Sequence, residues 1–251
     1  MKFVIFFIVL YFFVGLVLYI SQRGLLYYKT PEVNLPIDST YFKSGDEKIE
    51  VHVVNPGLKK AVIYFGGNAE SVGHSIYTIQ KSIPLYTLYL VNYRGYGRSS
   101  GTPSELGIYE DALAIYDEIK RSHETVSVIG RSLGSGVATY LAVERVLEKV
   151  VLVTPYDSIR NVAQKSFPIY PMSILLQDKY ESDKRAKDIK IPVLIVIAGR
   201  DQVIPNERSL ALVKAFDDNR NLIVEEIQAA DHNDISTYTK YDEIIKKFLE
   251  N

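Results

Sequence analysis

Residues 130–136 read Gly-Arg-Ser-Leu-Gly-Ser-Gly, and they directly follow a β-branched apolar run at 125–129. After this heptapeptide, apolar residues recur at helical spacing as far as Val146. The pattern G-x-S-x-G between a strand and an apolar helix is typical of a nucleophile elbow, a tight turn that exposes a serine hydroxyl. The sequence therefore predicts that Ser132 is a nucleophile. The alternative is a glycine-rich turn that serves only close packing.

A serine hydroxyl needs a base to remove its proton during attack. Where a serine stands on such an elbow, the acid and then the histidine follow it in the chain. The chain has four histidines, of which only the last lies downstream of the serine (His52, His74, His123 and His232). His232 is therefore the predicted base. His52 and His123 are expected at the surface, and His74, early in the first helix of the domain, is a candidate substrate contact.

Asp201 is the predicted acid because it follows a continuous apolar run at 191–198, which is typical of a buried parallel strand. Open α/β sheets place functional groups on the loops just past the carboxyl ends of their strands. There the carboxylate would hold the imidazole in one tautomer and stabilise the imidazolium as it forms. Asp157 is the alternative acid, and a turn or capping role is the alternative for Asp201. The two aspartates that flank the histidine are expected to be loop and cap residues (Asp231 and Asp234).

Acyl transfer also needs hydrogen-bond donors for the oxyanion that develops in the transition state. One predicted donor is the backbone N–H of Leu133, directly after the serine. An early strand at 61–65 is followed by Gly-Gly-Asn, in which the glycines allow the backbone amides to turn into a pocket. We expect the second donor to be the N–H of Asn68, with that of Gly67 as the alternative. A glycine turn used only for packing is the competing interpretation.

Together these segments resemble α/β-hydrolases of the serine-hydrolase type. The resemblance is closest to the small, N-terminally membrane-anchored members related to protein depalmitoylases and to the serine-aminopeptidase-like group. It rests on stretches that follow one another in the family's order (64–69, 92–105, 130–136, 191–205 and 231–233). The resemblance implies an α/β fold with a mainly parallel central sheet, helices on both faces and hydrolysis through an acyl-enzyme. Relatives carry a histidine where this chain has Gly66, which puts the rigidity of the oxyanion loop in doubt.

The stretch 92–105 is rich in glycine and serine, and a phosphate-binding loop is its alternative interpretation. No Gly-Lys-Ser/Thr follows, and no G-x-G-x-x-G opens a helix there, so nucleotide binding is not expected. A helix should begin after Ser104 as its N-cap. Its predicted apolar face consists of Leu106, Tyr109, Leu113 and Tyr116.

The N-terminus contains no charged residue from position 3 to position 20. A helix of that length spans about 27 Å, close to the hydrocarbon thickness of a bilayer. Because bulky residues occupy positions 18–20, where a signal peptide would need small ones, an uncleaved anchor is favoured. We therefore expect a transmembrane anchor at 1–22, a linker at 23–45 and an α/β-hydrolase domain at 46–251. Positive charges on the two sides nearly balance and leave the orientation open (Lys2, Arg23 and Lys29).

Composition excludes several classes of function. The chain has 29 Lys and Arg against 30 Asp and Glu, so neither a nucleic acid nor a polyanionic partner is expected. It has no cysteine, hence no disulfide framework, and the redox compartment stays undetermined. No cysteine and histidine cluster and no His-Glu-x-x-His occurs, so neither a metal nor another cofactor is expected. The oligomeric state is not predicted.

Only residues 155–190 separate the strand that follows the elbow helix from the acid-bearing strand, which predicts a short lid and an open site. An anchored enzyme meets substrates at the bilayer, and this favours lipid-type acyl esters and thioesters. The expected activity is that of an esterase, thioesterase or lysophospholipase. A peptidase or amidase using the same residues is the alternative, and a non-catalytic binding scaffold is a second one. A dehalogenase would need an aspartate in place of Ser132.

Overall fold

Over the residues that the structure describes, the fold is built on a twisted sheet of eight strands in the order β1-β2-β4-β3-β5-β6-β7-β8. The structure, a computed structural model, describes residues 1–33, 37, 39–216 and 219–251. Within them, β1 and β2 pair antiparallel to their neighbours, and every pair from β4 onward is parallel. This confirms the predicted mainly parallel sheet. The strands are β1 (Ser39–Ser44), β2 (Glu47–Val54), β3 (Lys60–Phe65), β4 (Thr87–Val91), β5 (Thr125–Arg131), β6 (Val150–Val153), β7 (Val193–Ala198) and β8 (Leu222–Ile227).

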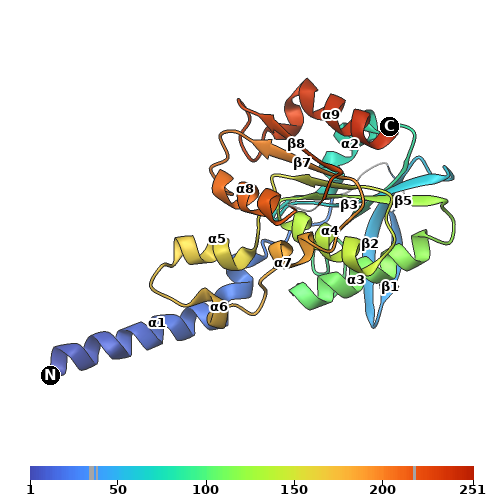
Figure 1. The fold of residues 1–251 in the computed structure, drawn as a ribbon. Coiled ribbons are helices and arrows are strands. Elements are labelled where there is room, and N and C mark those ends of the chain that lie inside the picture. The colour runs from blue at the N-terminus through green and yellow to red at the C-terminus, as the bar shows by residue number, and fades with distance from the viewer. Residues whose placement is uncertain (34–36, 38, 217–218) are drawn as a thin grey trace.

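Helices cover both faces of the sheet (Figure 1). One layer holds α2 and α9, and the other holds α3, α4, α7 and α8. Strands β6 and β7 are buried along their whole length because helices exclude water from both of their faces. The helices are α1 (Lys2–Leu26), η1 (Val72–Ser75), α2 (Ile76–Ser82), α3 (Glu105–Ile119), α4 (Leu133–Glu144), α5 (Ile159–Ser166), α6 (Met172–Leu175), α7 (Ser182–Ala186), α8 (Asn206–Ala215), η2 (Ile235–Thr237) and α9 (Thr239–Glu250).

The register of the parallel strands brings their carboxyl ends to one edge. Phe65 pairs with Gly130, Arg131 with Val153, and Val153 in turn with Val196. The loops that follow β3, β5, β6, β7 and β8 therefore gather at this edge, as expected for an open α/β sheet.

Helix α1 projects from the domain, and most of its side chains are exposed (Figure 1). Its mean hydropathy reaches 2.9, and its length and composition are sufficient to cross a membrane. The helix extends to Leu26, past the expected boundary at 22. The range expected as a linker also contains β1, which pairs with β2 in a hairpin closed at Gly45, where φ is +58°. The sheet therefore begins before residue 46.

The apolar face of α3 differs from the prediction. Ser104 does cap the helix, since its hydroxyl accepts the N–H of Gly107 at 3.1 Å. Leu106, however, is 68% exposed. Tyr109 and Tyr116 are buried as predicted, and Ile108 and Ala112 are buried beside them. Helical periodicity therefore predicted the right element and most of its buried face, with Leu106 as the exception.

Two histidines expected at the surface are buried, at 3% exposure for His52 and 7% for His123. The His52 ring lies 2.9 Å from the hydroxyl of Ser39. The His123 ring lies 2.9 Å from the hydroxyl of Tyr89 and 2.7 Å from the carbonyl oxygen of Leu58. These partners satisfy the ring nitrogens, which is what allows a polar side chain to be buried. Burial also lowers the pKa of His52.

Candidate active site

Ser132 stands on the turn between β5 and α4, with φ at +49°. Non-glycine residues rarely adopt this left-handed region, and such strain concentrates at functional sites. The flanking glycines are required sterically. A Cβ on Gly130 would lie 2.3 Å from the carbonyl oxygen of Gly134, and one on Gly134 would lie 2.0 Å from that of Phe65. The turn therefore leaves no room for a side chain at the positions two residues before and two residues after Ser132.

The structure brings together the three residues predicted as nucleophile, base and acid. The Oγ of Ser132 lies 2.9 Å from Nε2 of His232, and Nδ1 of the same ring lies 2.8 Å from Oδ2 of Asp201. The second carboxylate oxygen accepts the N–H groups of Val203 at 2.9 Å and Ile204 at 2.7 Å, which fixes its orientation. The side chains of His232 and Asp201 are almost fully buried. A hydroxyl, a base within reach and a third group that orients the base form the arrangement that activates a serine.

Asp157, the alternative acid, is engaged elsewhere. Its carboxylate pairs with Arg208 of α8 at 3.0 Å and accepts from Nδ2 of Asn161 at 2.7 Å. Next to the base, the Asp234 carboxylate accepts the N–H of Asp231 at 2.7 Å, which shapes the loop. These contacts are structural.

The loop after β3 lies against the elbow, since a Cβ on Gly67 would be 3.5 Å from that of Ser132. The Gly67 N–H already donates to Oε2 of Glu70 at 2.7 Å. This favours Asn68, rather than Gly67, as the second oxyanion donor. The other candidate, the N–H of Leu133, belongs to the first turn of α4, where backbone N–H groups have no acceptor within the helix.

The side chain of Asn68 fixes the loop from the far side. Its Oδ1 accepts the N–H of Tyr28 at 2.9 Å and the hydroxyl of Tyr96 at 2.9 Å. It also accepts the N–H of Ala69, whose φ of +59° marks a sharp local turn. The Asn68 side chain is therefore held by groups from two other parts of the chain and by the N–H of the next residue.

A buried ion pair that no sequence pattern indicated lies beneath these loops. Glu70 accepts hydrogen bonds from Tyr64, Gly67, Ser75 and Arg131, at 2.6–2.9 Å. The same guanidinium donates to the carbonyl oxygen of His232 at 3.0 Å. Burial opposes the charge on Arg131, but the neighbouring Glu70 carboxylate helps to raise the pKa of the guanidinium. One ion pair therefore joins the loop after β3, the elbow and the loop that carries His232.

This pair also bears on Gly66, the position at which the resemblance implied a histidine. A Cβ on Gly66 would lie 2.7 Å from Cγ1 of Val72 and 3.1 Å from Cδ of Glu70. The glutamate carboxyl group thus occupies space next to the position, and a histidine ring could not enter without displacing it. We attribute the support of the oxyanion loop in this chain to Glu70.

A small polar pocket lies beside the elbow and is lined by His74, Arg131 and Asn233, among others. His74 is exposed, which is compatible with the substrate contact considered for it. Across the described ranges, no group of three or more His, Cys, Asp and Glu side chains is placed to hold a metal ion.

Comparison with known proteins gives a consistent family. The profile of the serine hydrolase (FSH1) family matches residues 76–228, which include Ser132 and Asp201 and end before His232. An uncharacterized protein of Mycobacterium tuberculosis is 32% identical over 186 residues, 71% of this chain and 64% of that protein. The lysophosphatidylserine lipase ABHD12 of Mus musculus is 34% identical over 173 residues, 57% of this chain and 42% of the lipase. The chain thus spans less than two thirds of the length of these relatives.

Among solved structures, the Pyrococcus furiosus esterase Pf2001 superposes with a TM-score of 0.72 at 19% identity. The superposition covers 89% of this chain and 98% of the esterase. At this level of identity the likeness establishes the α/β-hydrolase fold.

Proposed function

Because this chain belongs to the serine hydrolase (FSH1) family of α/β-hydrolases, we propose that it cleaves lipid-type carboxylic esters or thioesters through an acyl-enzyme on Ser132. The observation that carries the proposal is the continuous hydrogen-bonded chain from Ser132 through His232 to Asp201. The similarity to a protein named as a lysophosphatidylserine lipase supports an ester of an amphiphile as the substrate class.

In the first step, Nε2 of His232 takes the hydroxyl proton while Oγ of Ser132 bonds to the substrate carbonyl carbon. The negative oxygen that forms accepts hydrogen bonds from the N–H groups of Asn68 and Leu133. The imidazolium, stabilised by Asp201, then gives its proton to the leaving alkoxide or thiolate as the carbon–oxygen or carbon–sulfur bond breaks. In the second half of the reaction, His232 takes a proton from a water molecule while the water oxygen bonds to the acyl carbon. The bond from that carbon to Oγ of Ser132 then breaks, His232 returns the proton to Oγ, and the carboxylic acid leaves.

We further propose that α1 anchors the protein in a membrane, with the transmembrane part at 1–22 and the hydrolase domain at 46–251 extended by β1. The support is the length and hydropathy of α1 and its outward exposure. Such an anchor holds the hydrolase domain at the surface where amphiphilic esters collect. Extraction with carbonate tests it: an integral protein stays in the membrane pellet, whereas a cleaved or peripheral protein is released.

Labelling with a fluorophosphonate probe tests the catalytic part of the proposal. The wild-type protein should be labelled, and the Ser132→Ala variant should not. Absence of labelling in the wild type, or equal labelling of the variant, would falsify the proposed nucleophile. A parallel panel of p-nitrophenyl esters, acyl thioesters and amino-acid p-nitroanilides distinguishes an esterase from a peptidase, and turnover confined to the anilides would exclude the ester substrates.

A further inference from the structure

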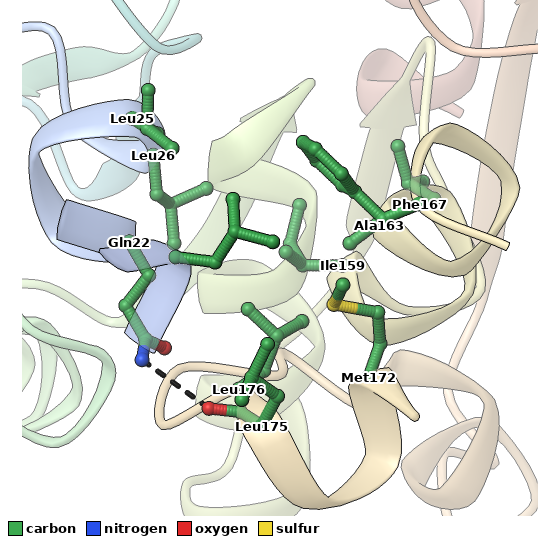
Figure 2. Close-up of a pocket in the computed structure, with 11 residues that line it drawn as sticks. Gln22, Leu25, Leu26, Ile159, Ala163, Phe167, Met172, Leu175 and Leu176 are labelled. Atoms are coloured by element: carbon green, nitrogen blue, oxygen red, sulfur yellow. Dashed lines mark hydrogen bonds between the residues drawn. The ribbon is translucent and has the colours of Figure 1, made fainter. Parts of the chain in front are cut away.

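An apolar pocket of about 190 Å³ lies between the second half of α1 and the lid helices α5 and α6 (Figure 2). Its one polar lining side chain among the described residues is Gln22, and the amide of Gln22 is fully used. Nε2 donates to the carbonyl oxygens of Tyr19 at 2.7 Å and Leu175 at 3.2 Å, while Oε1 accepts the N–H of Gln177 at 2.7 Å. The remaining lining is apolar, which suits a hydrocarbon occupant. It consists of Leu18, Leu25, Leu26, Ile159, Val162, Ala163, Phe167, Met172, Leu175 and Leu176.

The segment predicted as a lid is residues 155–190, and its part around α6 lies along α1. The rings of Tyr170 and Tyr11 stack at 4.7 Å, and each hydroxyl donates to a backbone carbonyl of the opposite segment. Gly15 makes room for this contact, since a Cβ there would lie 3.3 Å from the Tyr170 ring. At the other end, Arg23 pairs with Asp178 at 2.9 Å. The lid therefore follows α1 from Tyr11 to Arg23, a length of about 18 Å.

The contact between the lid and α1 determines how far into the bilayer the pocket would lie. If α1 enters the bilayer as proposed, the lid segment enters beside it, because the two are joined along that length. The lid residues that face outward fit such an environment: Ile169 is 69% exposed and Ile174 is 80% exposed. The pocket between α1 and the lid is then reached from the hydrocarbon layer.

Both walls of the pocket are connected by hydrogen bonds to loops of the candidate active site. On one side, Tyr28 follows the end of α1 by two residues, and its N–H donates to Oδ1 of Asn68 on the oxyanion loop. On the other side, α5 begins shortly after β6, whose last residue, Val153, accepts the N–H of Ser132 at 2.9 Å. The two walls of the pocket are therefore continuous, through these hydrogen bonds, with the loops that carry Asn68 and Ser132.

We propose that this pocket binds the acyl chain of a long-chain ester or thioester entering from the bilayer, and that α1 forms one of its walls. The inference rests on the proposed function of Ser132 and names the part of the substrate that is recognised. Each methylene moved from water into an apolar site gains a factor of about four in binding. The kcat/KM values should therefore rise about fourfold per added methylene until the pocket is full.

The test uses the full chain in phospholipid nanodiscs with p-nitrophenyl esters from acetate to decanoate. Ala163→Phe places a ring in the pocket from α5, and it should lower the decanoate-to-acetate ratio of kcat/KM at least tenfold. Ser166→Phe adds the same ring at an exposed position of the same helix, outside the lining, and should keep the wild-type ratio. Phe167→Ala widens the mouth and should move the preference toward longer chains, which gives a second measurement if Ala163→Phe does not fold.

Two kinds of failure are distinguishable. Absence of both acetate hydrolysis and fluorophosphonate labelling in the wild type overturns the proposed function itself. Normal acetate hydrolysis with no gain along the ester series, or a gain that survives both Ala163→Phe and Phe167→Ala unchanged, overturns the acyl pocket while the serine hydrolase remains. A loss of the chain-length preference in Ser166→Phe as well would assign the effect to the helix in general and also refute the pocket.

Discussion

Replacing Glu70 by glutamine tests whether one buried ion pair holds the active-site loops together. The Glu70 and Arg131 side chains are 9% and 14% exposed, and their charged atoms lie 2.9 Å apart. Removing one partner of a buried pair leaves the other charge uncompensated, which typically costs about 3–5 kcal/mol. A domain of this kind has about 5–15 kcal/mol of stability in total, so Glu70→Gln should lower the free energy of unfolding by a large fraction.

The double variant Glu70→Gln/Arg131→Met separates the effect of an uncompensated charge on stability from the effect of the altered side-chain shapes. Because both charges are then absent, it should be less destabilised than the sum of the single variants, with a coupling energy of about 2–3 kcal/mol. Urea unfolding of the full chain in detergent, followed by circular dichroism, gives the midpoint and slope for each variant. Initial ester-hydrolysis rates of Glu70→Gln should also fall, by up to about 10²-fold, because the oxyanion loop loses its support.

An exposed pair provides the matched control. Arg121 and Glu118 lie 2.9 Å apart on the surface, 75% and 59% exposed. Such pairs contribute about 0–1 kcal/mol, so Glu118→Gln and Arg121→Met should show almost no coupling. A coupling energy for the buried pair as small as that of the control, or a Glu70→Gln midpoint equal to that of the wild type, would refute the assigned role of Glu70.

Three further outcomes are expected. Asp201→Asn should lower kcat about 10⁴-fold with an unchanged far-UV spectrum, because an amide favours the wrong imidazole tautomer; a loss below tenfold would contradict its role as the acid. Gly134→Ala should abolish the yield of folded protein after detergent extraction, since its Cβ would lie 2.0 Å from the carbonyl oxygen of Phe65. A wild-type yield would count against such tight packing at the elbow. Burial lowers the pKa of His52, although the Glu50 carboxylate acts to raise it. The unfolded chain therefore binds a proton at His52 more readily than the folded chain does. Stability should therefore be full above pH of about 6.5 and decline as the pH falls below it. His52→Gln should flatten that decline in pH-dependent unfolding, and an unchanged slope would exclude His52 as its source.

The sequence predicted those features that depend on local pattern and on the topology of parallel sheets. Apolar runs located β5 to β8, and the rule that strand carboxyl ends share an edge anticipated the meeting of Ser132, Asp201 and His232. The catalytic roles of these residues stay predictions until they are tested.

Features that depend on contacts between residues far apart in the chain could not be predicted from the sequence. Glu70 and Arg131 are far apart in the chain, and neither lies in a pattern that requires a partner. The burial of His52 similarly depends on Ser39 in a strand too short and polar to be recognised. The contact between Tyr11 and the lid joins residues that are more than 150 positions apart.

The ion pair between Arg23 and Asp178 gives the first helix a structural role in the hydrolase domain. Asp178 is buried, and besides the guanidinium it accepts the N–H of Glu105 at the start of α3. A chain shortened to the hydrolase domain would keep this carboxylate and lose its counter-charge. Exchange of Lys2–Leu26 for an unrelated apolar helix would restore a membrane-spanning length without restoring Gln22 or Arg23 and their contacts with the 175–178 segment. The helix therefore supplies a counter-charge and packing contacts to the domain, in addition to the membrane attachment proposed for it.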